Sequence, residues 1–177
     1  MGVAFPQDIF EATYSPNWYS TYEALGLPKE KWEMADELWV RHYGKETAQL
    51  VEGAAETILD LRRKGYRLGI VSSGSESRVC REIEQSALAG IFETVICNEH
   101  VVHKKPHPEG LEIALQRLKS SPRESAYVGD APEDIQMGKR AHVLTVGVQS
   151  AYPSSARLLS SEPDIYLESL VELANHF

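Results

Sequence analysis

Two aspartates, Asp130 and Asp134, stand four residues apart at the end of a short apolar segment. Gly129 precedes the first of them and allows a sharp turn without the steric penalty of a Cβ atom. Carboxylate oxygens presented by such a turn are suitable ligands for a hard cation such as Mg²⁺. Two more polar positions, Ser72 and Lys105, lie next to other predicted strand ends upstream. If the fold brings these positions together, they predict a site for Mg²⁺ and a phosphate group.

Each of these residues has its own use in phosphate chemistry. Lys105 can supply a positive charge, and Ser72 can donate its hydroxyl to a phosphate oxygen. The backbone N–H groups of Ser73 and Gly74 can donate as well, and a helix predicted to begin at Glu76 would direct its positive end toward the same anion. The alternatives are purely structural. The lysine could be a solvated loop side chain, and the serines and the second aspartate could be helix caps.

From about residue 50 onward, apolar strand-like segments alternate with helical ones. The predicted strands are 66–71, 94–97, 126–128, 144–148 and 165–167. The predicted helices are 54–64, 76–86, 108–119, 132–142, 154–160 and 169–176. This alternation predicts an α/β fold with a mostly parallel sheet and helices on both faces. Sites in such sheets lie beyond the carboxyl ends of the strands, which places Ser72, Asp130 and the loop before Lys105 at one edge.

The first 50 residues are more aromatic. All three tryptophans and four of the eight tyrosines precede residue 44. Apolar residues at helix-like spacing predict one helix from about Trp18 to Leu25 and a second over 29–43. We interpret residues 15–50 as a small helical segment whose aromatic side chains pack against one another. The alternative is that some of them line a substrate pocket.

The polar positions resemble motifs two, three and four of the haloacid dehalogenase (HAD) superfamily of phosphohydrolases. Ser72 matches the hydroxyl at a strand end, and Lys105 matches the lysine that faces the phosphate. Asp130 and Asp134 match the metal-binding acids. The resemblance covers about residues 50–177 and follows the phosphoglycolate-phosphatase-like branch. It implies a Rossmann-like core with a helical cap, Mg²⁺ as cofactor and hydrolysis of a small phosphate ester through an aspartyl-phosphate.

The first motif of that superfamily, an Asp-x-Asp that contains the nucleophile, is missing from the sequence. Asp8 is the only aspartate among the first 35 residues and has no acid two positions later, so it is a weak substitute. Gly2-Val3 resembles the pair that often follows the second aspartate of the motif. We therefore expect a chain cut at its catalytic loop and inactive as it stands. The expected domains are 1–14 as a remnant after the first motif, 15–50 as a small helical cap and 51–177 as the HAD-like core.

Other functions stay open at this point. The missing nucleophile favours a non-catalytic phosphate- or Mg²⁺-binding module, or an interaction module, on the same scaffold. Dehalogenation is disfavoured, because Asp130 and Asp134 are acids of the Mg²⁺-binding type and haloacid chemistry needs no metal. His100, His103 and His107 surround two lysines, but their loop contains two prolines, so we interpret them as solvated side chains rather than metal ligands. The basic run at 62–64 suits the negative end of a helix better than substrate recognition.

The composition of the chain excludes some classes of binding partner. The formal charge of −8 argues against nucleic acid or an anionic membrane as a partner. No apolar run approaches the length of about 20 residues that a membrane span needs. The only two cysteines, Cys80 and Cys97, form no CxxC motif, which favours a reducing, cytoplasmic location. No sequence feature indicates the oligomeric state.

Overall fold

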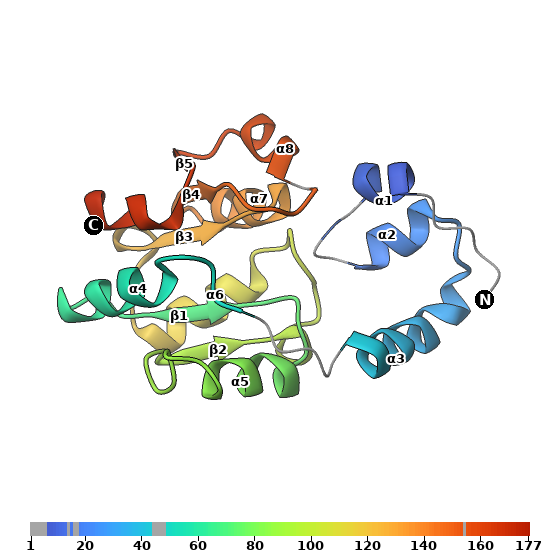
Figure 1. Cartoon of the computed structure of the whole chain (residues 1–177), viewed down its shortest axis with the longest axis horizontal. Helices are drawn as coiled ribbons and strands as arrows, with labels where there is room; N and C mark the ends of the chain where they lie inside the picture. The colour runs from blue at the N-terminus through green and yellow to red at the C-terminus, as the bar shows by residue number, and fades with distance from the viewer. Residues whose placement is uncertain (1–6, 14, 16–17, 44–48, 154) are drawn as a thin grey trace.

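The computed structural model describes residues 7–13, 15, 18–43, 49–153 and 155–177. All strands and the later helices form one body, and the first three helices lie beside it (Figure 1). Gly2-Val3, which resembles the pair after the missing motif, lies outside the described residues. Within the described ranges, no helix is both long and apolar enough to cross a membrane.

Five short parallel strands lie at the centre of this body. They are β1 (Gly69–Val71), β2 (Thr94–Ile96), β3 (Ala126–Gly129), β4 (Leu144–Val148) and β5 (Ile165–Leu167). β1 pairs with β2, and β3, β4 and β5 pair in that order. The predicted parallel α/β fold is therefore confirmed, although the described strands form two hydrogen-bonded groups rather than one continuous sheet.

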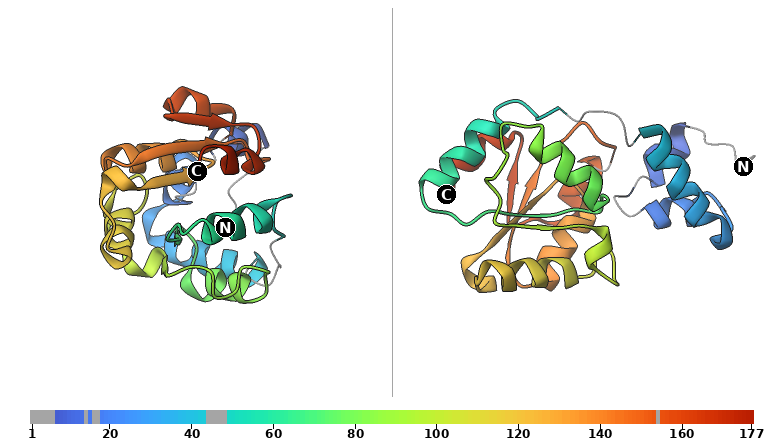
Figure 2. Two further views of the ribbon diagram at one scale, coloured as in Figure 1. Left: turned by 90° about the vertical axis from the view of Figure 1, so that its left-hand side faces the viewer. Right: turned by 90° about the horizontal axis from the view of Figure 1, so that it is seen from below.

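Helices cover both faces of the strands (Figure 2). The α-helices of this region are α4 (Ala54–Arg63), α5 (Glu76–Glu84), α6 (Glu109–Leu118), α7 (Pro132–Arg140) and α8 (Ser155–Leu158). Short 3₁₀ helices are η2 (Asn98–His100), η3 (Pro122–Glu124), η4 (Leu159–Ser161) and η5 (Leu170–Asn175). The sequence predicted α4 to α7 to within a few residues. The last predicted helix is instead a 3₁₀ helix, and its start is capped because Glu172 accepts the N–H of Ser169 at 2.9 Å.

Two clusters of buried apolar side chains hold these layers together. The first consists of Leu61, Val146, Val148, Leu167 and Leu173. The second consists of Leu111, Leu115, Met137, Ala141 and Val143. Val71 of β1 and Tyr127 of β3 pack against the second cluster. Because this cluster contacts a strand from each group, α6 and α7 join the two strand groups into one body.

The N-terminal helices have a small aromatic core of their own. They are α1 (Gln7–Thr13), α2 (Trp18–Ala24), η1 (Lys29–Lys31) and α3 (Trp32–Tyr43). The rings of Tyr19 and Trp32 stack with their centroids 5.0 Å apart, and Tyr22 beside them is 8% exposed. A cleft in this segment is lined by Tyr19, Glu33, Asp36, Glu37 and Arg41. Packing therefore explains most of the described aromatic residues, whereas Tyr19 also faces a cleft. The sequence pattern does not predict α1.

Gly138 is the point of closest contact between α7 and β4. A Cβ atom at this position would lie 2.6 Å from Cγ2 of Thr145. Thr145 is fully buried, and its hydroxyl donates to Asp164 at 2.6 Å, so the methyl group cannot easily move away. We expect Gly138→Ala to cost about 1–3 kcal/mol of unfolding free energy through overpacking. A gain of about 1 kcal/mol in helix propensity partly offsets this loss. Urea denaturation measures the net change.

Thr145→Ser provides the matched background for this test. It removes the blocking methyl group and keeps the hydroxyl that binds Asp164. In that background, Gly138→Ala should be neutral or stabilising. An equal loss of stability in both backgrounds would contradict the proposed clash.

Candidate active site

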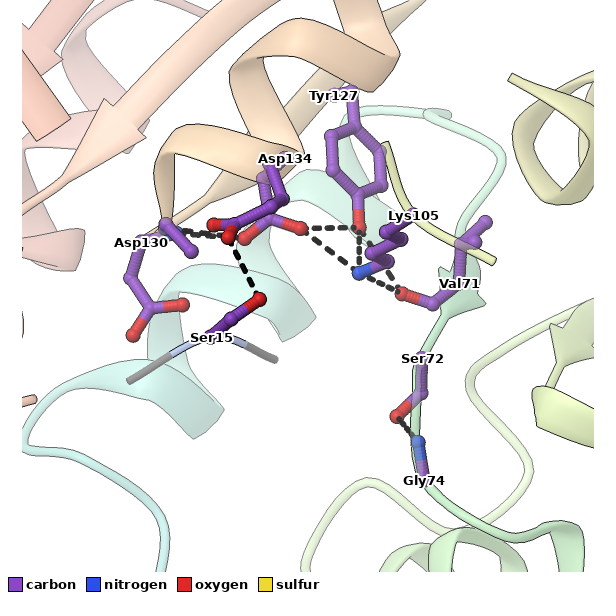
Figure 3. Close-up of polar contacts among 10 residues, drawn as sticks. Ser15, Val71, Ser72, Gly74, Lys105, Tyr127, Asp130 and Asp134 are labelled. Atoms are coloured by element: carbon purple, nitrogen blue, oxygen red, sulfur yellow. Dashed lines mark hydrogen bonds and ion pairs between the residues drawn. The ribbon is translucent and has the colours of Figure 1, made fainter. Parts of the chain in front are cut away.

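Lys105 and Asp134 form the centre of the candidate site (Figure 3). Nζ of Lys105 lies 2.8 Å from Oδ1 of Asp134, and the two side chains are only 11% and 6% exposed. The same ammonium donates to the Tyr127 hydroxyl at 2.8 Å and to the carbonyl of Val71 at 3.0 Å. Val71 ends β1 and Tyr127 belongs to β3. The lysine therefore connects the two strand groups at one edge.

The turn between β3 and α7 fixes the position of Asp134. Its Oδ2 accepts the backbone N–H groups of Asp130 and Ala131, each at 3.2 Å. A Cβ atom on Gly129 would lie 2.6 Å from this oxygen, so glycine is required for the close approach. Pro132 then begins α7, where its missing N–H costs nothing. One oxygen of Asp134 thus holds the lysine and the other holds the turn.

Burial and charge oppose each other at Lys105. Burial lowers its pKa, but the interactions with Tyr127 and Asp134 outweigh burial and raise the pKa above its ordinary range. Burial also raises the pKa of Tyr127 to about 12, so the phenol is neutral at pH 7. The attraction that matters at neutral pH therefore comes from Asp134. The ammonium group keeps its charge throughout the neutral range.

Asp130 lies beside this pair in a different environment. Burial raises the pKa of its carboxyl group and the charge of Asp134 adds to the effect, while a hydrogen bond from Ser150 and the charge of Lys105 oppose it. Figure 3 shows the Asp130 carboxylate directed away from Lys105. A half-buried carboxylate that is costly to ionise gains most from a nearby cation.

Ser72 follows Val71 directly and lies across Lys105 from Asp130 (Figure 3). Its Oγ accepts the N–H of Gly74 at 3.0 Å. The hydroxyl hydrogen of Ser72 has no acceptor among the described residues, so it can still be donated. Of the two backbone donors expected here, the N–H of Gly74 is used by this turn. The other expected donor is the N–H of Ser73, a half-buried residue between Ser72 and Gly74.

The start of α5 has an acidic neighbour. Both carboxylate oxygens of Glu99 accept the backbone N–H of Glu76, at 3.1 and 3.0 Å. The positive end of this helix therefore faces a carboxylate of the protein itself. One N–H at the start of this helix is thus engaged by Glu99 on η2, and the expectation that the helix start also faces the anion stays a prediction.

Two residues of this region, Ser15 and Glu133, are not predicted from the sequence. Ser15, which is 4% exposed, donates its hydroxyl to Oε1 of Glu133 at 2.7 Å. The other oxygen, Oε2, is buried and has no hydrogen-bond partner in the described part of the chain. The position of Glu133 beside Asp134 was a visible signal, whereas nothing in the sequence placed Ser15 near it. Asp8, the weak nucleophile candidate, is exposed on α1.

The structure thus brings four predicted residues to one edge of the strands. Lys105 contacts Asp134 directly, Asp134 accepts the N–H of Asp130, and Lys105 reaches the carbonyl of the residue before Ser72. A fixed positive charge, a free hydroxyl hydrogen and a buried carboxylate lie within one group. Such an arrangement can bind an anion and a cation together.

Comparison with known proteins gives an independent view of this arrangement. A family profile described as haloacid dehalogenase-like hydrolase matches residues 2–148. The chain is 32% identical over 161 residues to the pyrophosphatase PpaX of Bacillus velezensis, covering 89% of this chain and 74% of that protein. It is 37% identical over 122 residues to PpaX of Listeria welshimeri, covering 69% of this chain and 56% of that protein. The chain thus spans only part of the length of these relatives.

Solved structures agree on the fold. A haloacid dehalogenase-like hydrolase from Bacteroides fragilis superposes with a TM-score of 0.85 at 26% identity, covering 96% of this chain and 83% of that one. A predicted phosphoglycolate phosphatase from Haemophilus somnus gives a TM-score of 0.83 at 16% identity, covering 99% and 84%. At that identity, the second similarity concerns the fold alone.

Proposed function

Because this chain belongs to the haloacid dehalogenase-like hydrolases, we propose that it binds the phosphate group of a small molecule at the Lys105–Asp134 edge, with Mg²⁺ at Asp130. In a protein that also supplies a nucleophile, the same site would hydrolyse the phosphate ester through an aspartyl-phosphate. The alternative for the 177-residue polypeptide is binding of phosphate and Mg²⁺ without turnover. The absence of an Asp-x-Asp from its sequence favours this alternative.

The observation that carries the proposal is the buried Lys105–Asp134 pair. An ion pair this far from solvent is costly to desolvate and is weak evidence for stability by itself. Its position at the ends of β1 and β3 is where ligands bind in parallel α/β folds. Asp134 keeps the Lys105 ammonium group charged at this edge, and a phosphate oxygen can accept a hydrogen bond from that ammonium group.

One hydrogen bond of Lys105 could be given to a phosphate oxygen instead of its present acceptor. Its three N–H donors already face Val71, Tyr127 and Asp134. The carbonyl of Val71 also accepts from the Tyr127 hydroxyl at 3.0 Å. If a phosphate oxygen replaces this carbonyl as an acceptor, the carbonyl keeps one partner. We propose that Lys105 binds phosphate in this way and that Ser72 donates its free hydroxyl hydrogen to a second oxygen.

Two features of the turn fit a Mg²⁺ ion. The carboxyl group of Asp130 is costly to ionise because it is half-buried, and Oε2 of Glu133 is buried with no hydrogen-bond partner among the described residues. We propose Asp130 as the principal ligand, with Glu133 beside it and Asp134 in support. The ion would neutralise phosphate oxygens and polarise the phosphorus centre. Ser73 would assist Ser72 through its backbone N–H.

The substrate belongs to the class of small phosphate-containing molecules. The names of the PpaX relatives support pyrophosphate as one candidate. We propose that residues 15–50 act as a small cap that selects the substrate and that 51–177 form the core. The Ser15–Glu133 hydrogen bond supports this arrangement, because it joins the cap to the proposed metal turn.

Asp130→Asn tests the metal site. A raised folded-state pKa means that the carboxyl group stabilises the fold below its unfolded pKa and that this benefit is lost as the pH rises. Without Mg²⁺, Asp130→Asn should therefore be at least as stable as the unmodified chain at pH 7. With Mg²⁺ at 100 times its dissociation constant, the unmodified chain should gain about 2.7 kcal/mol, and the variant should gain nothing. Thermal denaturation with and without Mg²⁺ measures both effects.

Asp8→Asn is the matched control, because Asp8 is an exposed aspartate on α1. It should leave both the stability and the response to Mg²⁺ unchanged. Equal stabilisation of Asp130→Asn and the unmodified chain by Mg²⁺ would rule out Asp130 as the ligand.

A further inference from the structure

The loop that carries Lys105 presents three side chains of the metal-ligating type on its exposed side. His103 and His107 come from the loop, and Glu109 is the first residue of α6. One possible ligand atom from each of the three lies within 4.8 Å of the others. The two imidazole rings stack with their centroids 4.4 Å apart. No sequence pattern predicts Glu109 in this group, and the histidines were expected to be solvated side chains.

Backbone hydrogen bonds hold the carboxylate of Glu109 in a fixed position, which favours its use as a metal ligand. Its Oε1 accepts the N–H of Val102 at 2.9 Å, and its Oε2 accepts the N–H of His103 at 2.8 Å. These backbone hydrogen bonds lower the pKa of Glu109 to about 2, so it is a carboxylate at any physiological pH. The loop and the start of α6 therefore fix this oxygen pair before any metal binds.

Both imidazole rings turn an Nδ1 atom toward Glu109. Nδ1 of His103 lies 2.9 Å from Oε2 of Glu109, and Nδ1 of His107 accepts the backbone N–H of Glu109 at 3.2 Å. Ligands at 2.0–2.2 Å in a tetrahedral site stand about 3.4 Å apart. The His103 and Glu109 atoms lie closer than this, at the hydrogen-bond distance of 2.9 Å, so they would have to separate slightly around a metal ion. The other pairs of atoms, which lie within 4.8 Å of one another, would have to close by up to about 1.4 Å, which rotation of an exposed imidazole ring allows.

We propose that His103, His107 and Glu109 bind one divalent transition-metal ion, such as Zn²⁺ or Ni²⁺, at a site separate from Asp130. Two imidazole nitrogens and one carboxylate suit these ions, whereas Mg²⁺ prefers oxygen ligands alone. Three protein ligands leave a fourth position for water, as expected where both histidines are exposed. The site is thus suited to reversible binding rather than to a buried structural metal.

The surroundings of the cluster permit a cation. The nearby ammonium groups have acceptors of their own, because Lys104 donates to the carbonyl of Asn98 and Lys105 is paired with Asp134. Lys105 lies midway between the two histidines in the sequence, so a bound ion would restrain the loop that presents it. Metal binding by this cluster does not depend on the proposed function. Only an effect of the metal on phosphate binding would depend on that function.

Isothermal titration of the untagged chain with Zn²⁺ tests the proposal. One site is expected, and His103→Ala or His107→Ala should weaken binding at least about 10-fold. Glu109→Gln should weaken it similarly, because the neutral amide is a poor ligand. His142→Asn and His176→Ala, which remove histidines elsewhere, should leave the affinity unchanged, as should Asp130→Asn.

Paramagnetic Co²⁺ gives a readout that does not depend on substitutions. It should broaden the imidazole resonances of His103 and His107 and spare those of His142 and His176. Zn²⁺ affinity that is unchanged in both His103→Ala and His107→Ala would overturn the proposal, as would Co²⁺ broadening confined to other histidines. Loss of Zn²⁺ binding in Asp130→Asn alone would place the ion at the proposed Mg²⁺ site instead.

Discussion

Lys105→Met is expected to lower the free energy of unfolding by about 3–5 kcal/mol, because it breaks a buried ion pair on one side only. Asp134, with 6% of its side chain exposed, would keep its charge and lose the ammonium that faces Oδ1. The Tyr127 hydroxyl and the carbonyl of Val71 would each lose a donor as well. Urea denaturation of the two proteins measures the difference.

Lys104→Met is the matched control for this substitution. Lys104 is the preceding lysine on the same loop, but within the described part of the chain its ammonium donates to one acceptor, the carbonyl of Asn98. We expect its loss to cost only about 1 kcal/mol. The double variant Lys105→Met, Asp134→Asn should lose less than the sum of its single variants, by about 0.5–3 kcal/mol. Equal losses for the two lysines would contradict the central place given to Lys105.

The pH dependence of the Lys105 effect follows from the direction of its pKa shift. The folded-state pKa is raised, so the contribution of the lysine is fully present below its unfolded pKa and is lost only as the pH rises through the folded value. The stability deficit of Lys105→Met should therefore be constant across the neutral range. It should shrink only in strongly alkaline solution.

The parallel fold and the convergence of the site could be predicted because both follow from short-range patterns. Strand and helix periodicities are local, and parallel strands all deliver their carboxyl ends to one edge. Ser72 and Asp130 follow strands, so their common location required no knowledge of loop conformations. The positions of these residues were thus predictable, whereas the roles proposed for them stay predictions.

The remaining features depend on contacts that no local pattern encodes. Ser15 and Glu133 are 118 residues apart in the sequence and meet only when the N-terminal helices lie against the core. Glu99 reaches the start of α5 through the conformation of the segment after β2. The His103 and His107 pair gains Glu109 as a neighbour because the loop folds back on α6. Each of these contacts is decided by tertiary packing, which a periodicity does not specify.

The 177-residue polypeptide is expected to hydrolyse phosphate monoesters at least about 10³-fold more slowly than a polypeptide in which an apolar strand ending in Asp-x-Asp is joined ahead of Gly2. The site can bind and polarise a phosphoryl group, but each nearby carboxylate is otherwise engaged. Asp134 holds Lys105 and the turn, and Glu133 accepts a hydrogen bond from Ser15 through Oε1 and is proposed to lie beside the metal through Oε2. Asp130 is the proposed metal ligand. No carboxylate among these is left to attack phosphorus.

Turnover of p-nitrophenyl phosphate with and without Mg²⁺ by both polypeptides measures this difference. The extended polypeptide should be active only with Mg²⁺. Asp130→Asn should abolish that activity, because it removes the proposed principal ligand of the metal. Asp8→Asn should change little in either polypeptide, since Asp8 is exposed on α1 and lacks a second acid two residues later. Robust Mg²⁺-dependent turnover by the 177-residue polypeptide, abolished by Asp130→Asn, would mean that a nucleophile is already present within its own sequence. Asp8→Asn would then be the first variant to separate that nucleophile from the acids of the β3–α7 turn.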